Sequence, residues 1–340
     1  MASRIHGRLF PVEPTAKRVK FMLKVSVIIP AFNSARFIGE AVESVLCQTR
    51  SAEEIIIVDD GSTDNTREAV TALPVKYFYQ KNAGPSAARN TGLRNATGDL
   101  LAFLDADDLW LPHKLAVQLK AFENFPDAGF SFSTVWHLYA GTNPKISQDP
   151  YYPPQLTAWL RKKPLKDGGV YGSVYDLLLR KNCVATSSMV VRRELVERVG
   201  DLDTGLWGCE DYDYWIRLAR LAPAVFIERP VSRYRIVDDG LSGAWNARSE
   251  RFFQTAVQVV SAHMREYPSL TVRKAMGASL ADYAFYCLVA GRISDARQVS
   301  GRSLSMYPTG KGLKTFCEAM LPRTFSVLSQ IAHLGRSDSR

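Results

Sequence analysis

The feature that most constrains the fold is an alternation of short apolar runs and amphipathic segments between residues 25 and 134. The runs, such as Val25–Pro30, are rich in β-branched and aromatic residues, which favours strands buried on both faces. We expect strands at 25–30, 54–58, 75–80, 100–104 and 129–134, and helices at 35–48, 65–72, 85–96 and 112–123. Ser34 is expected to be the N-cap of the first helix. Strands that alternate with helices in this way predict an α/β fold: a Rossmann-like, mostly parallel sheet with helices on both faces.

The chain divides into three parts by composition and periodicity. Residues 1–21 carry scattered charge and no apolar period, so we expect a disordered leader and a translation start at Met22. Residues 22–245 are predicted to form the α/β domain, and residues 246–340 an all-helical C-terminal extension. Residues 141–172 are rich in Pro, Tyr and Lys, and are predicted to be a long loop over the ligand edge of the sheet. Beyond that loop we expect helices at 174–180, 192–199 and 212–221 and a strand at 186–191.

Charge and composition limit the classes of partner. The net charge of +9 is uneven, with +4 in residues 1–21 and +7 in residues 246–340. A basic C-terminal region is explained either by a solvated surface or by peripheral contact with an anionic membrane, and no nucleic-acid motif is present. No apolar run has the roughly 18–20 residues of a membrane span and no secretory signal is visible, so we expect a cytoplasmic protein, with the inner face of the plasma membrane as the alternative address. The five cysteines are scattered and indicate neither disulfides nor zinc.

Carboxylates follow the expected elements at three places. They are the pairs Asp59/Asp60, Asp105/Asp107 and Glu210/Asp211. Because open α/β sheets bind ligands at the carboxyl ends of their strands, the first two pairs are expected on one edge of the sheet. Asp105 and Asp107 are two residues apart and have the hard oxygen ligands that Mg²⁺ and Mn²⁺ prefer, although a solvated acidic turn would have the same sequence. Glu210 and Asp211 suit either a helix start or a partly desolvated general base.

Five motifs in order carry a resemblance to a known family. They are residues 25–33, 58–64, 82–90, 105–108 and 208–211. In these motifs the chain resembles glycosyltransferase family 2, whose members are nucleotide-sugar-dependent inverting enzymes of the GT-A fold. The resemblance covers about residues 22–240.

The resemblance implies roles for individual residues. Contacts with the nucleotide sugar are expected from Pro30, Phe32, Asn33, Asp59, Asp60, Arg89, Asp105 and Glu210. Phe32 stands where the family more often has Tyr, and Arg89 is expected to face the diphosphate or a neighbouring Asp. A divalent metal, Mg²⁺ or Mn²⁺, is expected on Asp107 with Asp105. Asp211 is the residue expected to deprotonate the acceptor hydroxyl.

The implied reaction is a single inverting displacement. A sugar would move from a nucleoside-diphosphate donor, expected to be UDP-linked, to a hydroxyl of a saccharide or lipid-linked saccharide in surface-polysaccharide assembly. One departure is notable, because relatives often have a histidine where this chain has Val237.

Two other classes stay open on the sequence. A sugar-nucleotide nucleotidyltransferase would need a Gly-rich loop with Arg and Lys after the first strand, which residues 31–36 lack. A catalytically inactive sugar-binding or scaffold member would be expected to lose Asp105, Asp107 or Asp211, and all three are present. Dinucleotide-binding and P-loop glycine motifs are absent.

Overall fold

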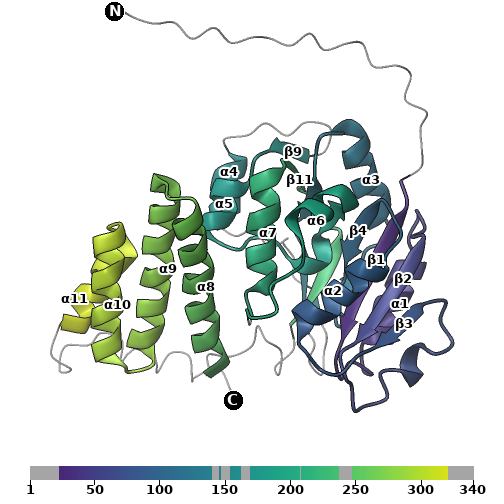
Figure 1. Ribbon diagram of the computed structural model, residues 1–340, viewed down its shortest axis with the longest axis horizontal. Coiled ribbons are helices and arrows are strands. Elements are labelled where there is room, and N and C mark those ends of the chain that lie inside the picture. The colour runs from purple at the N-terminus through teal and green to yellow at the C-terminus, as the bar shows by residue number, and fades with distance from the viewer. Residues whose placement is uncertain are drawn as a thin grey trace, which may run out of the picture.

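The structure is a computed structural model that describes residues 23–139, 145–146, 154–161, 169–206, 208–236 and 247–320. The predicted leader at 1–21 and the position of the missing histidine, Val237, lie outside these residues. Figure 1 shows a sheet flanked by helices on one side of the molecule and a row of helices, α8 to α11, on the other. The α/β sheet and the helical C-terminal region confirm the predicted fold class.

The central sheet has eight strands in the order β3-β2-β1-β4-β10-β6-β11-β9. Their bounds are β1 Val25–Ala31, β2 Glu54–Asp59, β3 Lys76–Tyr79, β4 Leu100–Phe103, β6 Phe130–Ser133, β9 Gly169–Gly172, β10 Val190–Arg192 and β11 Ala224–Ile227. β1 pairs in parallel with β2 on one side and β4 on the other, while β10 runs antiparallel between β4 and β6. The carboxyl ends of β1, β2 and β4 therefore reach the same edge, with β1 in the middle.

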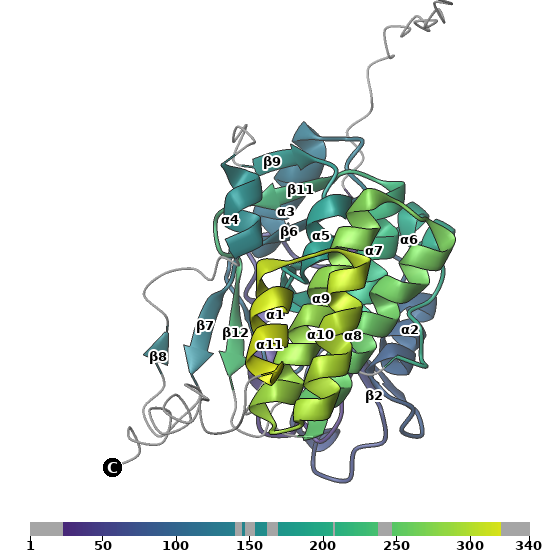
Figure 2. The same cartoon turned by 90° about the vertical axis from the view of Figure 1, so that its left-hand side faces the viewer.

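A second sheet of four strands was not predicted. It has the order β5-β12-β7-β8, with bounds β5 Leu109–Trp110, β7 Trp136–Tyr139, β8 Lys145–Ile146 and β12 Ser232–Ile236. Figure 2 shows β7, β8 and β12 as a separate group beside the main sheet. These strands are too short for an alternating pattern to be visible, and their polar and aromatic residues resemble loop sequence. Their importance is that β12 brings Arg235 to the acids after β4.

The helices cover the sheet and continue beyond it. They are α1 Ile38–Leu46, α2 Pro85–Asn95, α3 Lys114–Asn124, α4 Pro154–Leu160, α5 Tyr175–Arg180, α6 Arg193–Val199, α7 Glu210–Leu221, α8 Ala247–Glu266, α9 Leu270–Val289, α10 Ile293–Met306 and α11 Gly310–Met320. Two short 3₁₀ helices, η1 Glu68–Val70 and η2 Thr186–Ser188, complete the described elements. Within the described residues, no helix combines the length and the apolar character needed to cross a bilayer.

Four local predictions were wrong. The helix expected at 65–72 is only the short η1, and the strand expected at 186–191 begins as η2 before β10. The loop expected at 141–172 contains β8, α4 and β9. Ser34 was expected to cap the first helix, but α1 begins at Ile38, and the Ser34 hydroxyl instead hydrogen-bonds to the backbone of Phe32.

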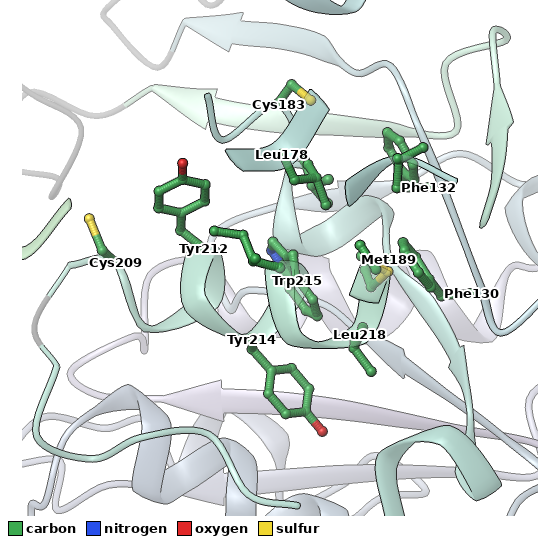
Figure 3. Packing of buried hydrophobic residues seen from close by; sticks show 14 of the residues in the cluster. Phe130, Phe132, Leu178, Cys183, Met189, Cys209, Tyr212, Tyr214, Trp215 and Leu218 are labelled. Atoms are coloured by element: carbon green, nitrogen blue, oxygen red, sulfur yellow. The ribbon is translucent and has the colours of Figure 1, made fainter. Parts of the chain in front are cut away.

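Helix α7 anchors one end of the core. Trp215 is completely buried and packs edge-to-face on Phe103 of β4, with ring centroids 5.6 Å apart. Figure 3 shows α7 side chains, Trp215 and Leu218 among them, packed with residues of neighbouring elements. The same apolar cluster includes Val260 of α8 and Leu280 of α9. The helical region is therefore part of the same core as the sheet, and the burial of each such side chain contributes about 1.5–3 kcal/mol to stability.

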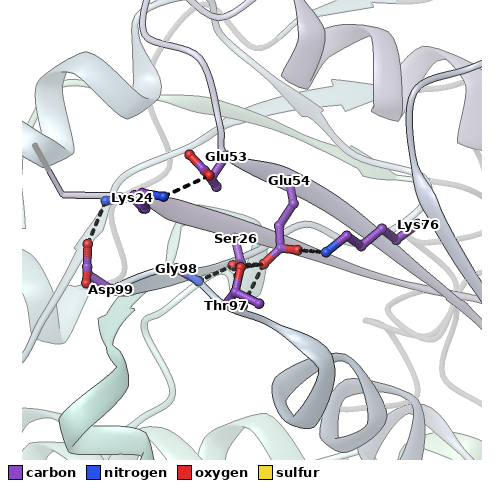
Figure 4. A network of polar contacts seen from close by, with 8 residues as sticks. All are labelled: Lys24, Ser26, Glu53, Glu54, Lys76, Thr97, Gly98 and Asp99. Atoms are coloured by element: carbon purple, nitrogen blue, oxygen red, sulfur yellow. Dashed lines mark hydrogen bonds and ion pairs between the residues drawn. The ribbon is translucent and has the colours of Figure 1, made fainter.

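A polar network lies at the amino ends of the parallel strands, away from the expected site (Figure 4). Glu54, the first residue of β2, accepts hydrogen bonds from Ser26, Thr97 and Lys76 at 2.5–2.8 Å. Burial alone would raise the pKa of this carboxyl, but the hydrogen bonds outweigh burial and hold the pKa at about 2. The network therefore joins β1, β2, β3 and the turn before β4 through one ionised carboxylate.

Candidate active site

The loop after β1 presents an aromatic ring and a strained turn at the carboxyl edge. Phe32 is 50% exposed there, and Asn33 adopts a left-handed backbone with φ 49°. The Asn33 side chain accepts a hydrogen bond from the Thr63 backbone at 2.8 Å, and its backbone donates to Ser62 Oγ at 2.9 Å. The loops after β1 and β2 are thereby joined, with Phe32 at their rim. Pro30 lies within β1, paired with Val58 of β2.

Asp59 and Asp60 are nearly inaccessible and their oxygens already accept protein hydrogen bonds. Asp59 accepts from the Ser62 backbone at 2.7 Å and from the Tyr77 hydroxyl. Asp60 Oδ1 accepts from Gln80 at 2.7 Å, and both of its oxygens accept backbone N–H groups just before α2. In this structure the two carboxylates order the loops around Phe32 and the start of α2.

Arg89 of α2 connects two of the acidic places. Its guanidinium donates to Asp105 at 2.8 Å and to Glu210 at 2.9 Å. Only 5% of Arg89 is exposed, and burial would lower its pKa, but the two carboxylates outweigh burial and raise it. One oxygen of Glu210 and Arg89 Nε are buried and have no hydrogen-bond partner among the described atoms. Because an unsatisfied buried polar atom is costly, this cluster has capacity for a further polar ligand.

Asp107 and Asp108 also follow β4, and their pKa values are affected by neighbouring carboxylates, Asp105 among them. Burial, reinforced by the charge of Asp105, raises the pKa of Asp107 to about 6. Burial also raises the pKa of Asp108, whose carboxylate accepts from Ser187 Oγ at 2.5 Å and from the Arg235 backbone at 2.8 Å. Arg235 donates to the backbone oxygen of Asp107 and forms an ion pair with Glu40 at 2.7 Å.

A divalent cation fits Asp107 and Asp105 in part. A cation would relieve the repulsion that raises the pKa of Asp107, and one Asp105 oxygen is not engaged by Arg89. In the described part of the chain, however, no three His, Cys, Asp or Glu residues are grouped closely enough to hold a metal by themselves. Mg²⁺ is commonly held by one or two carboxylates together with substrate phosphates, which is the arrangement that these two residues permit.

Asp211 lies in the first turn of α7, held from two sides. Its Oδ2 is 3.2 Å from the Thr186 hydroxyl and 3.5 Å from Asn182 Nδ2, while Oδ1 accepts from the Tyr212 backbone at 2.6 Å. Burial, reinforced by the charge of Glu210, raises the pKa of Asp211 to about 6. A carboxylate with such a pKa is ionised at neutral pH and is a stronger base than an ordinary aspartate.

Asp213, two residues further along α7, has a different environment. It forms an ion pair with Arg217 at 2.7 Å and lies 3.6 Å from His263 of α8. Burial would raise its pKa, but these two partners lower it. Asp213 therefore joins α7 to the helical region.

The short helix η2 connects the acids after β4 with Asp211. The Ser187 hydroxyl accepts from the Asp105 backbone at 3.0 Å and donates to Asp108, while the Thr186 hydroxyl donates to Asp211. Two backbone carbonyl groups of η2 accept hydrogen bonds from buried side chains: Trp110 donates to the carbonyl of Ser187, and Lys114 donates to the carbonyl of Ser188. Sequence reasoning missed Thr186 and Ser187 because the run was interpreted as a strand. Three consecutive hydroxyl residues ahead of an apolar run were the available signal.

A cleft of about 400 Å³ opens in front of Asp211. Arg89, Asp105 and Glu210 line one side, and the end of α5, α8 and α9 line another. Of the predicted site residues, the structure thus places these three and Asp211 together. Among the described residues that line the cleft, none comes from the loops that carry Phe32, Asp59 and Asp60.

Comparison with protein families gives a match to the larger part of the sheet. The profile described as Glycosyl transferase family 2 matches residues 26–194. An uncharacterized glycosyltransferase of Nostoc sp. is 38% identical over 194 residues, covering 54% of this chain and 56% of the relative. This chain therefore spans about half the length of that relative. TuaG of Bacillus subtilis, provisionally named a teichuronic acid biosynthesis glycosyltransferase, is 29% identical over 67% of this chain and 86% of its own.

Solved structures show the same fold at low sequence identity. Residues 1–349 of S. aureus TarS, in complex with UDP-GlcNAc, match with a TM-score of 0.56 and 15% identity, covering 87% of this chain and 90% of TarS 1–349. The mannosyltransferase PcManGT of Pyrobaculum calidifontis, in complex with GDP-Man and Mn²⁺, matches with a TM-score of 0.53 and 21% identity, covering 93% of this chain and 88% of that one. Both comparisons place the sheet and its helices in the GT-A fold.

Proposed function

We propose that this chain, residues 26–194 of which belong to glycosyl transferase family 2, is an inverting glycosyltransferase that uses a nucleotide sugar as donor. The observation that carries the proposal is Asp211. Its carboxylate faces the cleft, has a pKa of about 6, and is oriented by Thr186 and Asn182. A general base needs a fixed position, access to substrate and a pKa near the working pH, and Asp211 has all three.

The proposed reaction is a single displacement. Asp211 accepts the proton of the acceptor hydroxyl as its oxygen attacks the anomeric carbon, and the bond to the nucleoside diphosphate breaks on the opposite face. Since Arg89 is bound to Asp105 and Glu210, its role is to set the distance between the acids after β4 and the start of α7. A divalent metal bound by Asp107 and Asp105 would neutralise charge on the departing diphosphate.

The substrates are proposed from the comparisons and the sequence together. TarS is described with UDP-GlcNAc and PcManGT with GDP-Man and Mn²⁺, which supports a nucleotide-sugar donor and a divalent metal; we propose a UDP-linked sugar. The name of TuaG supports an acceptor in surface-polysaccharide assembly, with a saccharide or lipid-linked saccharide hydroxyl as the nucleophile. We propose action at the cytoplasmic face of the membrane, supported by the charge of +7 in residues 246–340.

The test begins with donor binding. Thermal unfolding of the full chain is measured with each of a panel of UDP-, GDP- and dTDP-sugars, with and without Mn²⁺; a donor at about 100 times its Kd adds about 2.7 kcal/mol of stability. Slow transfer from the selected donor to methanol is then followed by NMR, which reports the configuration of the methyl glycoside because a glycoside does not mutarotate. Inverted product, lost in Asp211→Asn, is the expected result. Donor binding without any turnover would favour a sugar-binding scaffold, and retained configuration would contradict the displacement.

A further inference from the structure

One wall of the cleft, formed by α5, α8 and α9, contains charged and aromatic residues that have no role in the proposed reaction. Past Asp211, the lining comes from the end of α5 and from α8 and α9 of the C-terminal region. Figure 1 shows α5 next to these two helices. These lining residues are Arg180, Lys181, Asn182, Phe252, Phe253 and Asp282. Asn182 of this wall lies 3.5 Å from Asp211, so a molecule bound along the wall could present a hydroxyl to the base.

The wall carries excess positive charge. Lys181 lies 3.9 Å from Asp282, but Asp282 also binds Lys311 at 2.6 Å, so one carboxylate faces two ammonium groups. Arg180 is exposed, and no carboxylate in the described part of the chain forms an ion pair with it. Arg89, by contrast, is neutralised by Asp105 and Glu210. Of the described arginines and lysines that line the cleft, the two without a full partner, Arg180 and Lys181, both belong to this wall.

The cations line the same cleft as the base. Lys181 directly precedes Asn182, whose side-chain nitrogen is 3.5 Å from Asp211. In the same wall, Phe252 of α8 remains 40% exposed, although its neighbour Phe253 packs with Tyr286 of α9. An exposed ring among polar side chains is typical of small-molecule sites.

We propose that the end of α5 and helices α8 and α9 form an acceptor subsite for a sugar that carries a negative charge, a carboxylate or a phosphate. Arg180 and Lys181 bind the anion, Phe252 contacts the sugar ring, and the hydroxyl to be glycosylated lies at Asp211. The proposal rests on the proposed function and assigns the helical region to acceptor recognition.

The test uses three methyl glycosides that differ only at C6. They are methyl β-glucoside, which is neutral, methyl β-glucuronide, which has a carboxylate, and methyl β-glucoside 6-phosphate. Binding to the full chain in the presence of UDP and diamagnetic Mg²⁺ is measured by ligand-observed NMR. We expect at least one anionic glycoside to bind about fivefold or more tightly than the neutral one. The advantage should shrink as NaCl is raised.

A matched pair of double variants tests the residues. Arg180→Gln with Lys181→Gln should abolish the preference, whereas Arg302→Gln with Lys314→Gln, which removes two exposed charges from α10 and α11, should keep it. Preference for the glucuronide or for the phosphate identifies the anion. Equal binding of all three, absence of binding, or a preference that survives the first double variant would overturn the subsite. UDP binding in the same samples separates these results from failure of the proposed function, in which UDP would not bind.

Discussion

Two groups of carboxylates lie near opposite ends of the same parallel strands, and they differ in the partners and charges that surround them. At the amino ends, Glu54 accepts four hydrogen bonds and has a pKa of about 2. At the carboxyl ends, burial and mutual repulsion raise the pKa values of Asp107 and Asp211 to about 6. Burial alone therefore does not mark a functional acid. A neighbouring carboxylate that adds to the effect of burial does, since it leaves a charge for a ligand to neutralise.

The two groups have opposite effects on stability as pH changes. The folded-state pKa of Glu54 is below its ordinary value of 4.5, so its stabilisation is complete above pH 4.5 and is lost as the pH falls toward 2. Asp107 has a folded-state pKa above its ordinary value of 3.8, so folding favours its protonated form. Its contribution is therefore lost as the pH rises from about 4 to 6.

The largest expected effect is at Asp211. Asp211→Asn should reduce turnover by at least about 10²-fold, because an amide cannot accept the proton of the acceptor hydroxyl. UDP affinity and melting temperature should stay near those of the wild type. Glu54→Gln, at the other end of the strands, is the control and should keep turnover per folded molecule within about threefold. Wild-type-like turnover of Asp211→Asn would remove this residue from the mechanism and leave Glu210 as the next candidate.

The second effect is on metal-dependent donor binding. Asp107→Ala should abolish the dependence of UDP affinity on Mn²⁺, a coupling expected to be about tenfold or more in the wild type. The melting temperature without metal at pH 7.5 should be unchanged or higher, because the variant removes a charge from a repulsive group. Calorimetric titration with UDP at several Mn²⁺ concentrations measures the coupling. An unchanged Mn²⁺ dependence would show that the metal is held elsewhere.

The third effect is on stability alone. Glu54→Gln should lower the free energy of unfolding by about 1.5–3 kcal/mol at pH 7, since an amide group would face donors from Thr97 and Lys76. Urea unfolding between pH 2 and 7 should show the difference shrinking below pH 4.5. A difference that is constant with pH would mean that the Glu54 charge does not stabilise the fold.

The sequence predicted the residues whose function depends on local order. Asp105 and Asp107 could be predicted at the edge of the sheet because they directly follow an apolar run that is typical of a buried strand. Arg89 was expected on a helix, facing the diphosphate or a neighbouring Asp, and its hydrogen bond to Asp105 agrees with the second alternative. Its contact with Glu210, 121 positions away, is encoded by no periodicity. The second sheet, and with it Arg235, was missed for the same reason. Thr186 and Ser187 were missed because a single turn of 3₁₀ helix has no period of its own.

The smallest expected effect is at Thr186, and it tests whether scarce donors tune the base. Thr186→Val keeps the shape of the side chain but removes the hydroxyl 3.2 Å from Asp211, one of few donors to that carboxylate. Turnover should fall by about threefold to tenfold, the equivalent of one hydrogen bond. Since the base acts when deprotonated, wild-type turnover should rise with pH through about 6 and then level off. Losing a donor to the ionised form should move this rise to higher pH, and Thr186→Ser, which retains the hydroxyl, should restore it. A Thr186→Val profile with lower turnover but the wild-type midpoint would mean that Thr186 only supports η2, so that the pKa of Asp211 is set by burial and Glu210 alone.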